Sequence, residues 1–154
     1  MSTMRDPTAR QVADMIARYT PEIADAITAC RRKLCARVPR GYELVYDSYN
    51  ALAIGYAWAD QASASLVSIA AYPRWVTLFF LYGQGLPDPE GLLEGDGVRV
   101  RSLRLGAPED LDRPAVQQLL ELALAPHAAD FAAAPPLQTV VKVIAAKRRE
   151  RRPA

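Results

Sequence analysis

Residues 44–58 have the sequence LVYDSYNALAIGYAW, and the second half of this segment alternates small and large side chains. The small residues there are alanine or glycine, and the large ones are Leu52, Ile54, Tyr56 and Trp58. A period of two is the period of a β-strand, and the segment DSYN at residues 47–50 favours a turn. We therefore expect a strand beginning near Leu44, a turn, and a second strand with a large face and a small face. The small face leaves room for a neighbouring layer or for a ligand.

Further strands are indicated on the C-terminal side of this segment. Residues 65–72 and 75–82 are apolar and predict a β-hairpin, and residues 98–105 predict the next strand. Between these strands, residues 83–97 contain five glycines and two prolines, a composition typical of a long loop. Residues 137–146 are rich in valine, isoleucine and threonine and predict a last strand, with a helix continuing into Lys147 as the alternative.

Helix start signals flank the predicted sheet on both sides. Asp6-Pro7 precedes an apolar stripe with helical spacing, and Thr20-Pro21 precedes a second one. A third helix is expected from Asp112 to near His127, followed by a connector at residues 128–136. Successive strands joined by short turns favour antiparallel pairing, with the helices packed on one face. The sequence therefore predicts an α+β fold in two layers, with a mostly antiparallel sheet of about five or six strands, two N-terminal helices and a C-terminal helix.

The composition is that of one globular domain. The chain has 154 residues, of which 51% are hydrophobic and 23% charged. We expect a single domain over residues 1–146 and a basic, flexible tail over residues 147–154. No apolar segment approaches the roughly 20 residues of a membrane-spanning helix, and residues 1–10 lack the pattern of a secretory signal. These features lead us to expect a cytoplasmic protein with no membrane association and with both cysteines reduced.

Residues 85–97 have the sequence GLPDPEGLLEGDG and are followed by Arg101 and Leu105. This loop resembles the signature of the YdhG-like family, a domain family of unknown function, and the resemblance extends over residues 7–124. It implies a compact two-layer α/β fold. The usual Gly-Lys of the signature is Gly97-Val98 here, so a basic residue that binds a ligand in relatives would have to be replaced by Arg99 or Arg101.

Residues typical of catalysis are scarce in this chain. The one histidine, His127, lies where a helix is expected to end, and with two cysteines it cannot supply a structural zinc site. The segment Gly83-Gln84-Gly85 lacks the remainder of a phosphate-binding loop. We therefore expect a binding domain rather than an enzyme, with no resident cofactor.

Arginines and aromatic residues on the predicted strands suggest a ligand site. Arg99 and Arg101 share one face of an ideal strand and could form bidentate hydrogen bonds with an anion. The aromatic residues expected on neighbouring strands are Tyr46, Tyr56, Trp58 and Tyr82. Together they predict a site for a small anionic or polar ligand, or for a protein partner, in a cleft between the sheet and the 83–97 loop. The alternative is that the aromatic rings pack under the helices and the arginines remain in solvent.

Two other functions stay open at this point. Some YdhG-like proteins are labelled frataxin-like iron chaperones, and carboxylates of the loop could bind a hard cation such as iron. These carboxylates are Asp88, Glu90, Glu94 and Asp96. The basic residues from Lys147 to Arg152 could hold nucleic-acid phosphates, or form a solvated end of the chain. The sequence is compatible with a monomer or a homodimer.

Overall fold

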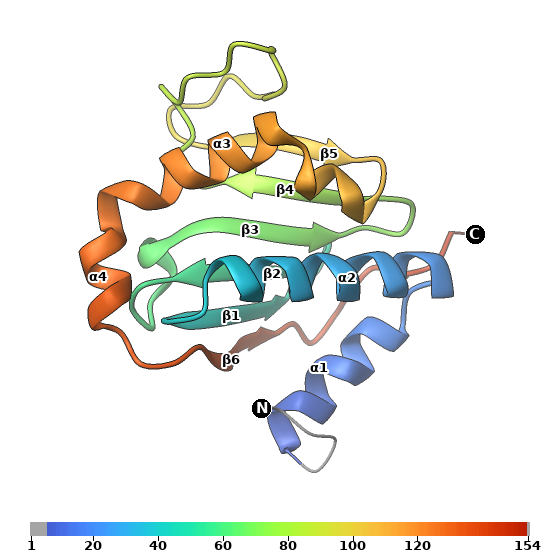
Figure 1. Ribbon diagram of the computed structural model, residues 1–154. Helices are drawn as coiled ribbons and strands as arrows, with labels where there is room; N and C mark the ends of the chain where they lie inside the picture. The colour runs from blue at the N-terminus through green and yellow to red at the C-terminus, as the bar shows by residue number, and fades with distance from the viewer. Residues whose placement is uncertain (1–5, 154) are drawn as a thin grey trace.

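The computed structural model describes residues 6–153 and confirms the α+β fold in two layers. Figure 1 shows α2 (Pro21–Arg37) and α3 (Pro114–Leu124) lying across one face of a single sheet. In chain order, the helices and strands are α1 (Pro7–Ala17), α2 (Pro21–Arg37), β1 (Tyr42–Asp47), β2 (Leu52–Ala57), β3 (Ser65–Ala71), β4 (Val76–Phe80), β5 (Arg101–Leu105), α3 (Pro114–Leu124), α4 (Ala128–Ala133) and β6 (Gln138–Ile144). Short 3-10 helices lie at η1 (Ala62–Ala64), η2 (Pro108–Asp112) and η3 (Ala125–His127).

Within the described residues the sheet has six strands in the order β5-β4-β3-β2-β1-β6. Neighbouring strands are antiparallel from β5 to β1, whereas β6 runs parallel to β1. The chain reaches β6 by passing from one edge of the sheet to the other through α3 and α4, as a parallel pair requires. Of the two alternatives for residues 137–146, the structure has the strand.

The large face of β2 forms the centre of the core. Leu52, Ile54 and Tyr56 are each 0% exposed and belong to one cluster with the buried side chains of α2. These α2 residues are Ile23, Ile27, Cys30 and Leu34. Complete burial of such a side chain is worth about 1.5–3 kcal/mol, so this contact between α2 and the sheet accounts for much of the stability of the two-layer fold.

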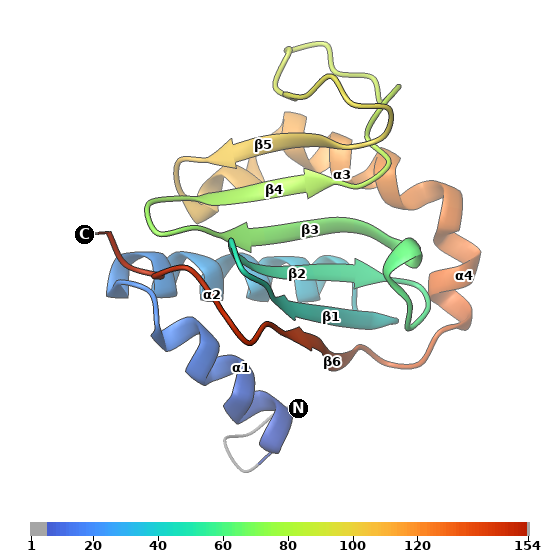
Figure 2. The same ribbon diagram turned by 180° about the vertical axis from the view of Figure 1, so that it is seen from behind.

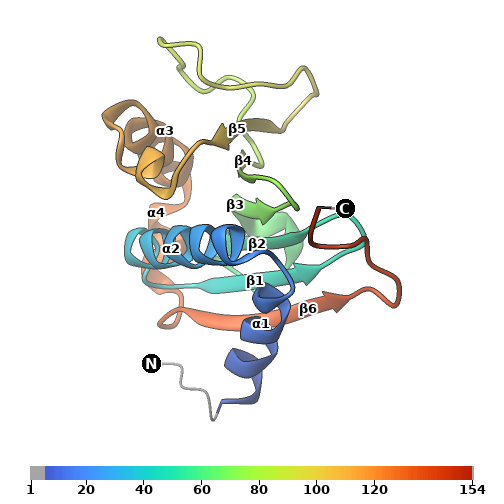
Figure 3. The ribbon, with the colours of Figure 1, turned by 90° about the vertical axis from the view of Figure 1, so that its right-hand side faces the viewer.

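Among the described residues, no α-helix covers the opposite face of the sheet, although the 3-10 helix η1 packs at one end of it through Ala64. Figure 3 shows α2 and α3 on one side of the sheet, and Figure 2 shows the other side with the strands in front. This open face includes the small residues Ala53, Gly55 and Ala57 of β2. Gly55 and Ala57 are nevertheless buried, because neighbouring side chains such as Leu44 and Ala64 pack around them.

The structure differs from the sequence prediction at residues 128–136. The expected connector contains helix α4, which carries one large side chain, Phe131. An alanine-rich segment has high helix propensity but shows no apolar stripe, so hydrophobic periodicity does not reveal it.

The strand predicted at residues 98–105 begins three residues later, at Arg101. The carbonyl of Arg99 accepts a hydrogen bond from the N–H of Gln84 at 2.9 Å, and the backbones of Glu94 and Ser102 pair with each other. Residues 98–100, of which Arg99 bonds to the loop, do not extend the pairing of β5 with β4.

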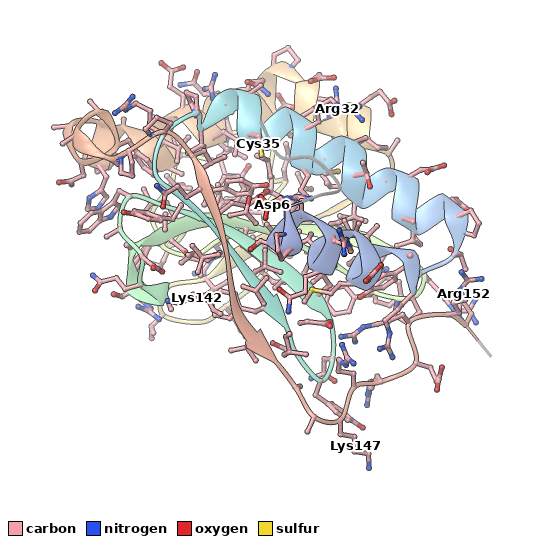
Figure 4. The ribbon with its side chains drawn as sticks, turned by 90° about the horizontal axis from the view of Figure 1, so that it is seen from below. Asp6, Arg32, Cys35, Lys142, Lys147 and Arg152 are labelled. Carbon is pink, nitrogen blue, oxygen red and sulfur yellow. The ribbon has the colours of Figure 1, made fainter. Side chains whose placement is uncertain are left out.

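The basic segment after residue 146 packs against the domain instead of extending away from it. Arg151 is 2% exposed, and its Nη2 lies 2.9 Å from Asp47 Oδ1. Arg148 also pairs with Asp47, and Arg152 donates to the carbonyl of Arg18 at the end of α1. Figure 4 shows this segment from Lys147 to Arg152 passing beside α1. Contacts with the domain thus continue past the boundary predicted at residue 146.

Parts of two predicted segments lie outside the described residues, namely residues 1–5 of the domain and residue 154 of the tail. Across residues 6–153, no helix is long and apolar enough to span a membrane. This finding agrees with the absence of a long apolar segment in the sequence.

Candidate functional site

A cleft of about 380 Å³ lies at one end of the sheet. It is bounded by the C-terminal end of β2, by the start of β3, by the segment that follows β4, and by the C-terminal end of α3. We call it the Trp58 cleft, and it is lined by Trp58, Ser63, Leu66, Tyr82, Leu86, Leu122, Ala123, Pro126 and His127. Its walls are mostly apolar, with aromatic rings at several positions.

Trp58 and His127 form one aromatic wall of this cleft. Their rings are stacked, with centroids 5.3 Å apart and an angle of 11° between the planes. Nδ1 of His127 lies 2.9 Å from Asp130 Oδ2, so the imidazole is held both through its face and through its edge. The sequence placed Trp58 on the same face as Tyr56, but β2 ends at Ala57 and the indole turns toward α3 and η3.

Tyr82 also lines the cleft, and Arg99 lies over its ring without being a lining residue. The Cζ atom of Arg99 lies 5.0 Å from the centroid of the Tyr82 ring, and the Tyr82 hydroxyl donates to the carbonyl of Ser63 at 2.7 Å. A guanidinium over an aromatic face is attracted by the ring quadrupole. Among the described residues, no carboxylate pairs with Arg99. Its hydrogen-bond donors therefore remain available beside the cleft.

The 83–97 loop is anchored in a way that positions these groups. The Asp88 carboxylate accepts hydrogen bonds from the N–H groups of Leu92 and Leu93, each at 2.9 Å. Leu86, Leu92 and Leu93 pack against the core, and Leu86 also lines the cleft. The bond between the Gln84 N–H and the Arg99 carbonyl joins the two ends of the loop. The loop thereby supplies one wall of the cleft and holds Arg99 near Tyr82.

Three of the six predicted ligand residues do not reach this site. Arg101 turns back to the loop and donates to the carbonyls of Gly97 and Val100, at 2.7 and 2.8 Å. Tyr56 is fully buried under the helices, as the alternative expectation had it for all the aromatic residues. Tyr46 lies on the open face of the sheet and lines a different hollow. Of the six residues, Trp58 and Tyr82 therefore line the cleft, and Arg99 lies over the Tyr82 ring without lining it.

The four carboxylates proposed for iron do not form one ligand set. Asp88 is occupied by the loop backbone, and Glu90 lies 3.8 Å from Arg113. Glu94 and Asp96 are exposed. No group of three or more His, Cys, Asp or Glu side chains in the described part of the chain is placed to hold a metal ion.

Glu43 is a buried carboxylate that the sequence patterns did not indicate. It is 1% exposed and forms two hydrogen bonds with Arg31, at 2.7 and 2.9 Å. It also accepts hydrogen bonds from Tyr56 at 2.8 Å and from Thr139 at 2.7 Å. Glu43 and Asp47 lie on the helix-facing side of β1, two positions to either side of Val45. That alternation is the one signal in the sequence that could have indicated a buried acidic pair.

The groups around Glu43 are held in unreactive states. Burial favours a raised pKa for Glu43, but the hydrogen bonds and charge of Arg31, with smaller contributions from Thr139 and Tyr56, leave the pKa below its usual value. Burial and the nearby Glu43 raise the pKa of Cys35 to about 12, and they raise the pKa of Tyr56 as well. Neither the thiol nor the phenol is therefore ionised near neutral pH. The cluster ties α2, β1, β2 and β6 together.

Comparison with known proteins finds no matching family model, no matching curated protein and no matching solved structure. The resemblance of residues 85–97 to the YdhG-like family stays a prediction from the sequence. Because a fold alone does not assign a function, a function for this chain has to be inferred from the geometry of the Trp58 cleft.

Proposed function

We propose that this protein is a binding domain for a small planar anion, which places its ring in the Trp58 cleft and its negative group at Arg99. The observation that carries the proposal is that the Trp58–His127 stack and Tyr82 line one cleft, while Arg99 lies over the Tyr82 ring beside it. These are an apolar aromatic surface and an unpaired cation, which are the two features that such a ligand needs. An aromatic carboxylate is the simplest member of this class.

The size and lining of the cleft support a ring-sized ligand. Small-molecule sites are usually clefts of roughly 300–1,000 Å³ with mostly apolar walls and a few polar groups. The Trp58 cleft has about 380 Å³, and Leu66, Leu86 and Leu122 form its aliphatic walls. A flat ring can stack or pack edge-on against the Trp58 indole, whose orientation is fixed by His127.

Arg99 supports the anionic part of the proposal. A guanidinium binds a carboxylate through two parallel hydrogen bonds, which gives both affinity and orientation. The contact with Tyr82 restricts the Arg99 side chain before a ligand arrives. Less side-chain entropy is then lost on binding.

Benzoate binding to a Trp75→Phe variant tests the proposal. The chain has two tryptophans, so this variant leaves Trp58 as the single indole reporter. We expect benzoate to change Trp58 fluorescence in a saturable way. Benzamide, which has the same ring without the charge, should bind about tenfold or more weakly, because a hydrogen bond to a charged group is worth about 1.5–3 kcal/mol.

Two arginine variants provide the comparison in the same background. Arg99→Ala should weaken benzoate binding about tenfold or more. Arg104→Ala is the matched control. In the parent protein, Arg104 also lies over an aromatic ring, that of Trp75, but at a different pocket. Equal benzoate affinity in the two variants, with both proteins folded, would remove Arg99 from the site. No saturable change in the parent would remove the proposal itself.

The iron and nucleic-acid alternatives have less support from the geometry. The four loop carboxylates lie apart, and two of them already have partners within the protein. In the basic C-terminal segment, Arg148 and Arg151 are paired with Asp47, which leaves fewer cations for phosphates. Unchanged iron uptake after joint neutralisation of Asp88, Glu90, Glu94 and Asp96 would remove the iron alternative.

A further inference from the structure

A second hollow, of about 210 Å³, lies on the open face of the sheet. We call it the Gly55 hollow, and its lining includes Tyr46, Ala53, Gly55, Ala62, Ser65 and Leu81. It shares no lining residue with the Trp58 cleft. The floor consists of the small face of β2, and the taller side chains stand around it.

The absence of a side chain at Gly55 makes room for the hydroxyl of Ser65. A Cβ atom at this position would lie 2.9 Å from Ser65 Oγ and 3.4 Å from Ser65 Cβ. The hydroxyl of Ser65 is thus directed over the glycine, on the same side of the sheet as the hollow. Ala53, two residues earlier on the same face, adds only a methyl group to the floor.

Two hydroxyl groups at the hollow have no hydrogen-bond partner among the described residues. They are the Oη atom of Tyr46 and the Oγ atom of Ser65, and both atoms are buried. Ser65 as a whole is 4% exposed. The other buried side-chain atom of this kind in residues 6–153 is Nε of Arg151, whose guanidinium is otherwise paired. A buried polar group left unpaired is unfavourable, so such groups are rare without a reason.

The rest of the molecule shows how its tyrosine hydroxyls are normally satisfied. Tyr19 donates to the carbonyl of Ala71 at 2.6 Å, and Tyr56 donates to Glu43 at 2.8 Å. Buried tyrosines of the core are therefore paired within the protein. Tyr46 and Ser65 differ from them in lining a hollow, and a molecule bound there can supply the missing partner.

The charges near the hollow favour a neutral occupant. No charged side chain lines it, and the two charged groups that act on Tyr46, Lys142 and Asp60, pair with each other at 2.8 Å. Burial raises the pKa of Tyr46, so its hydroxyl stays protonated and can donate at neutral pH. An ionised ligand would lose hydration here without gaining an opposite charge.

From this geometry we infer that the Gly55 hollow is a second binding site, which takes a small uncharged ring compound bearing a hydroxyl group. The ring lies on Gly55 and Ala53, and its hydroxyl pairs with Ser65 Oγ and Tyr46 Oη. The size is adequate, because an apolar protein cavity of about 150 Å³ is known to accept benzene. This site goes beyond the proposed function, since it differs from the Trp58 cleft in its residues, its face and the charge of its ligand.

Phenol and toluene are suitable probes, because they have nearly the same shape and differ in the hydroxyl group. Backbone amide signals of Gly55 and Ser65 in the ¹⁵N-labelled protein report on the hollow. We expect phenol to shift these signals in a saturable way. Toluene should bind about 3- to 10-fold more weakly, which is the effect of one neutral hydrogen bond.

Removal of each hydroxyl sharpens the test. Ser65→Ala and Tyr46→Phe should each weaken phenol binding about 3- to 10-fold and leave toluene binding unchanged. Neither change should lower the melting temperature of the free protein, because the hydroxyl that it removes has no partner. Ser102→Ala and Tyr42→Phe are matched controls on the same open face but outside the hollow, and should bind phenol as the parent does.

Three results would overturn this inference. One is an absence of any phenol shift at Gly55 and Ser65, which would mean that the hydroxyls are satisfied by solvent. Another is equal binding of phenol and toluene, which would indicate apolar association alone. The third is unchanged phenol affinity in both Ser65→Ala and Tyr46→Phe. Benzoate binding at Trp58 is measured separately, so failure of one site is distinguishable from failure of the other.

Discussion

Asp47 and Arg151 form an ion pair in which each side chain is 1% exposed. Removing one partner of such a pair leaves a buried charge, which typically costs about 3–5 kcal/mol. Because Arg148 also contacts Asp47, we predict that Arg151→Met lowers the free energy of unfolding by a smaller amount, about 2–4 kcal/mol. Urea unfolding measures the change.

Lys147→Met is the matched control for Arg151→Met, since Lys147 is exposed and lies in the same basic segment. It should change the free energy of unfolding by no more than about 0.5 kcal/mol. Equal unfolding midpoints for the two variants would show that the C-terminal segment does not stabilise the domain.

Glu43 gives the protein a defined pH dependence. Its pKa in the folded state lies below the ordinary value of 4.5, so the unfolded chain binds the proton more readily than the folded one. The stabilisation from ionised Glu43 is complete above pH 4.5 and is lost as the pH falls through the folded-state pKa. We predict that the stability difference between the parent and Glu43→Gln narrows below that pH, as measured by urea unfolding from pH 7 to pH 3. A difference that stays constant or widens in acid would contradict this.

The sequence predicted a cleft between the sheet and the 83–97 loop, but it could not show which of the six candidate residues line that cleft. Trp58, Tyr82 and Arg99 stand out as aromatic and cationic residues near a glycine-rich loop. The partners of Glu43 lie 12 and 96 positions away in the chain, at Arg31 and Thr139. Local periodicity carries no information on contacts at such separations, so the buried cluster was missed.

At the scale of elements, Gly41 fixes the start of the β1–β6 pair. Its φ angle is +109°, and a Cβ atom there would lie 2.3 Å from the carbonyl oxygen of Ala57. Its backbone also bonds to Pro135 and Gln138. Both the positive φ and the close contact exclude a side chain.

We predict that Gly41→Ala lowers the free energy of unfolding by about 2 kcal/mol or more. Gly97→Ala is the control, because a Cβ atom at Gly97 meets nothing within 4 Å. Thermal or urea unfolding of the two variants provides the comparison. If Gly41→Ala were as stable as Gly97→Ala, the close approach of β1 to the end of β2 would be wrong.

Elements with a strong period were predictable, and elements that depend on distant partners were not. The β1–β2 and β3–β4 hairpins follow from alternation and turn residues within short segments. Helix α4 lacks an amphipathic stripe, and residues 98–100 have the composition of a strand but pair with the loop. Strand β6 pairs with β1 because α3 and α4 connect β5, at one edge of the sheet, to the opposite edge. No local sequence pattern predicts this long connection.

At the scale of the whole molecule, the two layers create two different surfaces. The helices cover one face of the sheet and leave the other open, as Figures 2 and 3 show. The Trp58 cleft forms where the end of α3 and the 83–97 loop meet the sheet, whereas the Gly55 hollow lies on the open face. The α+β class was predictable from the order of the elements. The meeting of α3 with the loop was not, because it depends on how the layers are stacked.

The most direct test of the proposed function uses the two indole N–H signals of the parent protein during titration with benzoate. Trp58 lines the cleft, whereas Trp75 lies in another pocket with Arg104 Cζ 3.8 Å from its ring centroid. We predict that the Trp58 signal shifts in a saturable way, that the Trp75 signal stays in place, and that Arg99→Ala suppresses the shift. A Trp58 signal that does not move, or two indole signals that move together, would contradict the proposal.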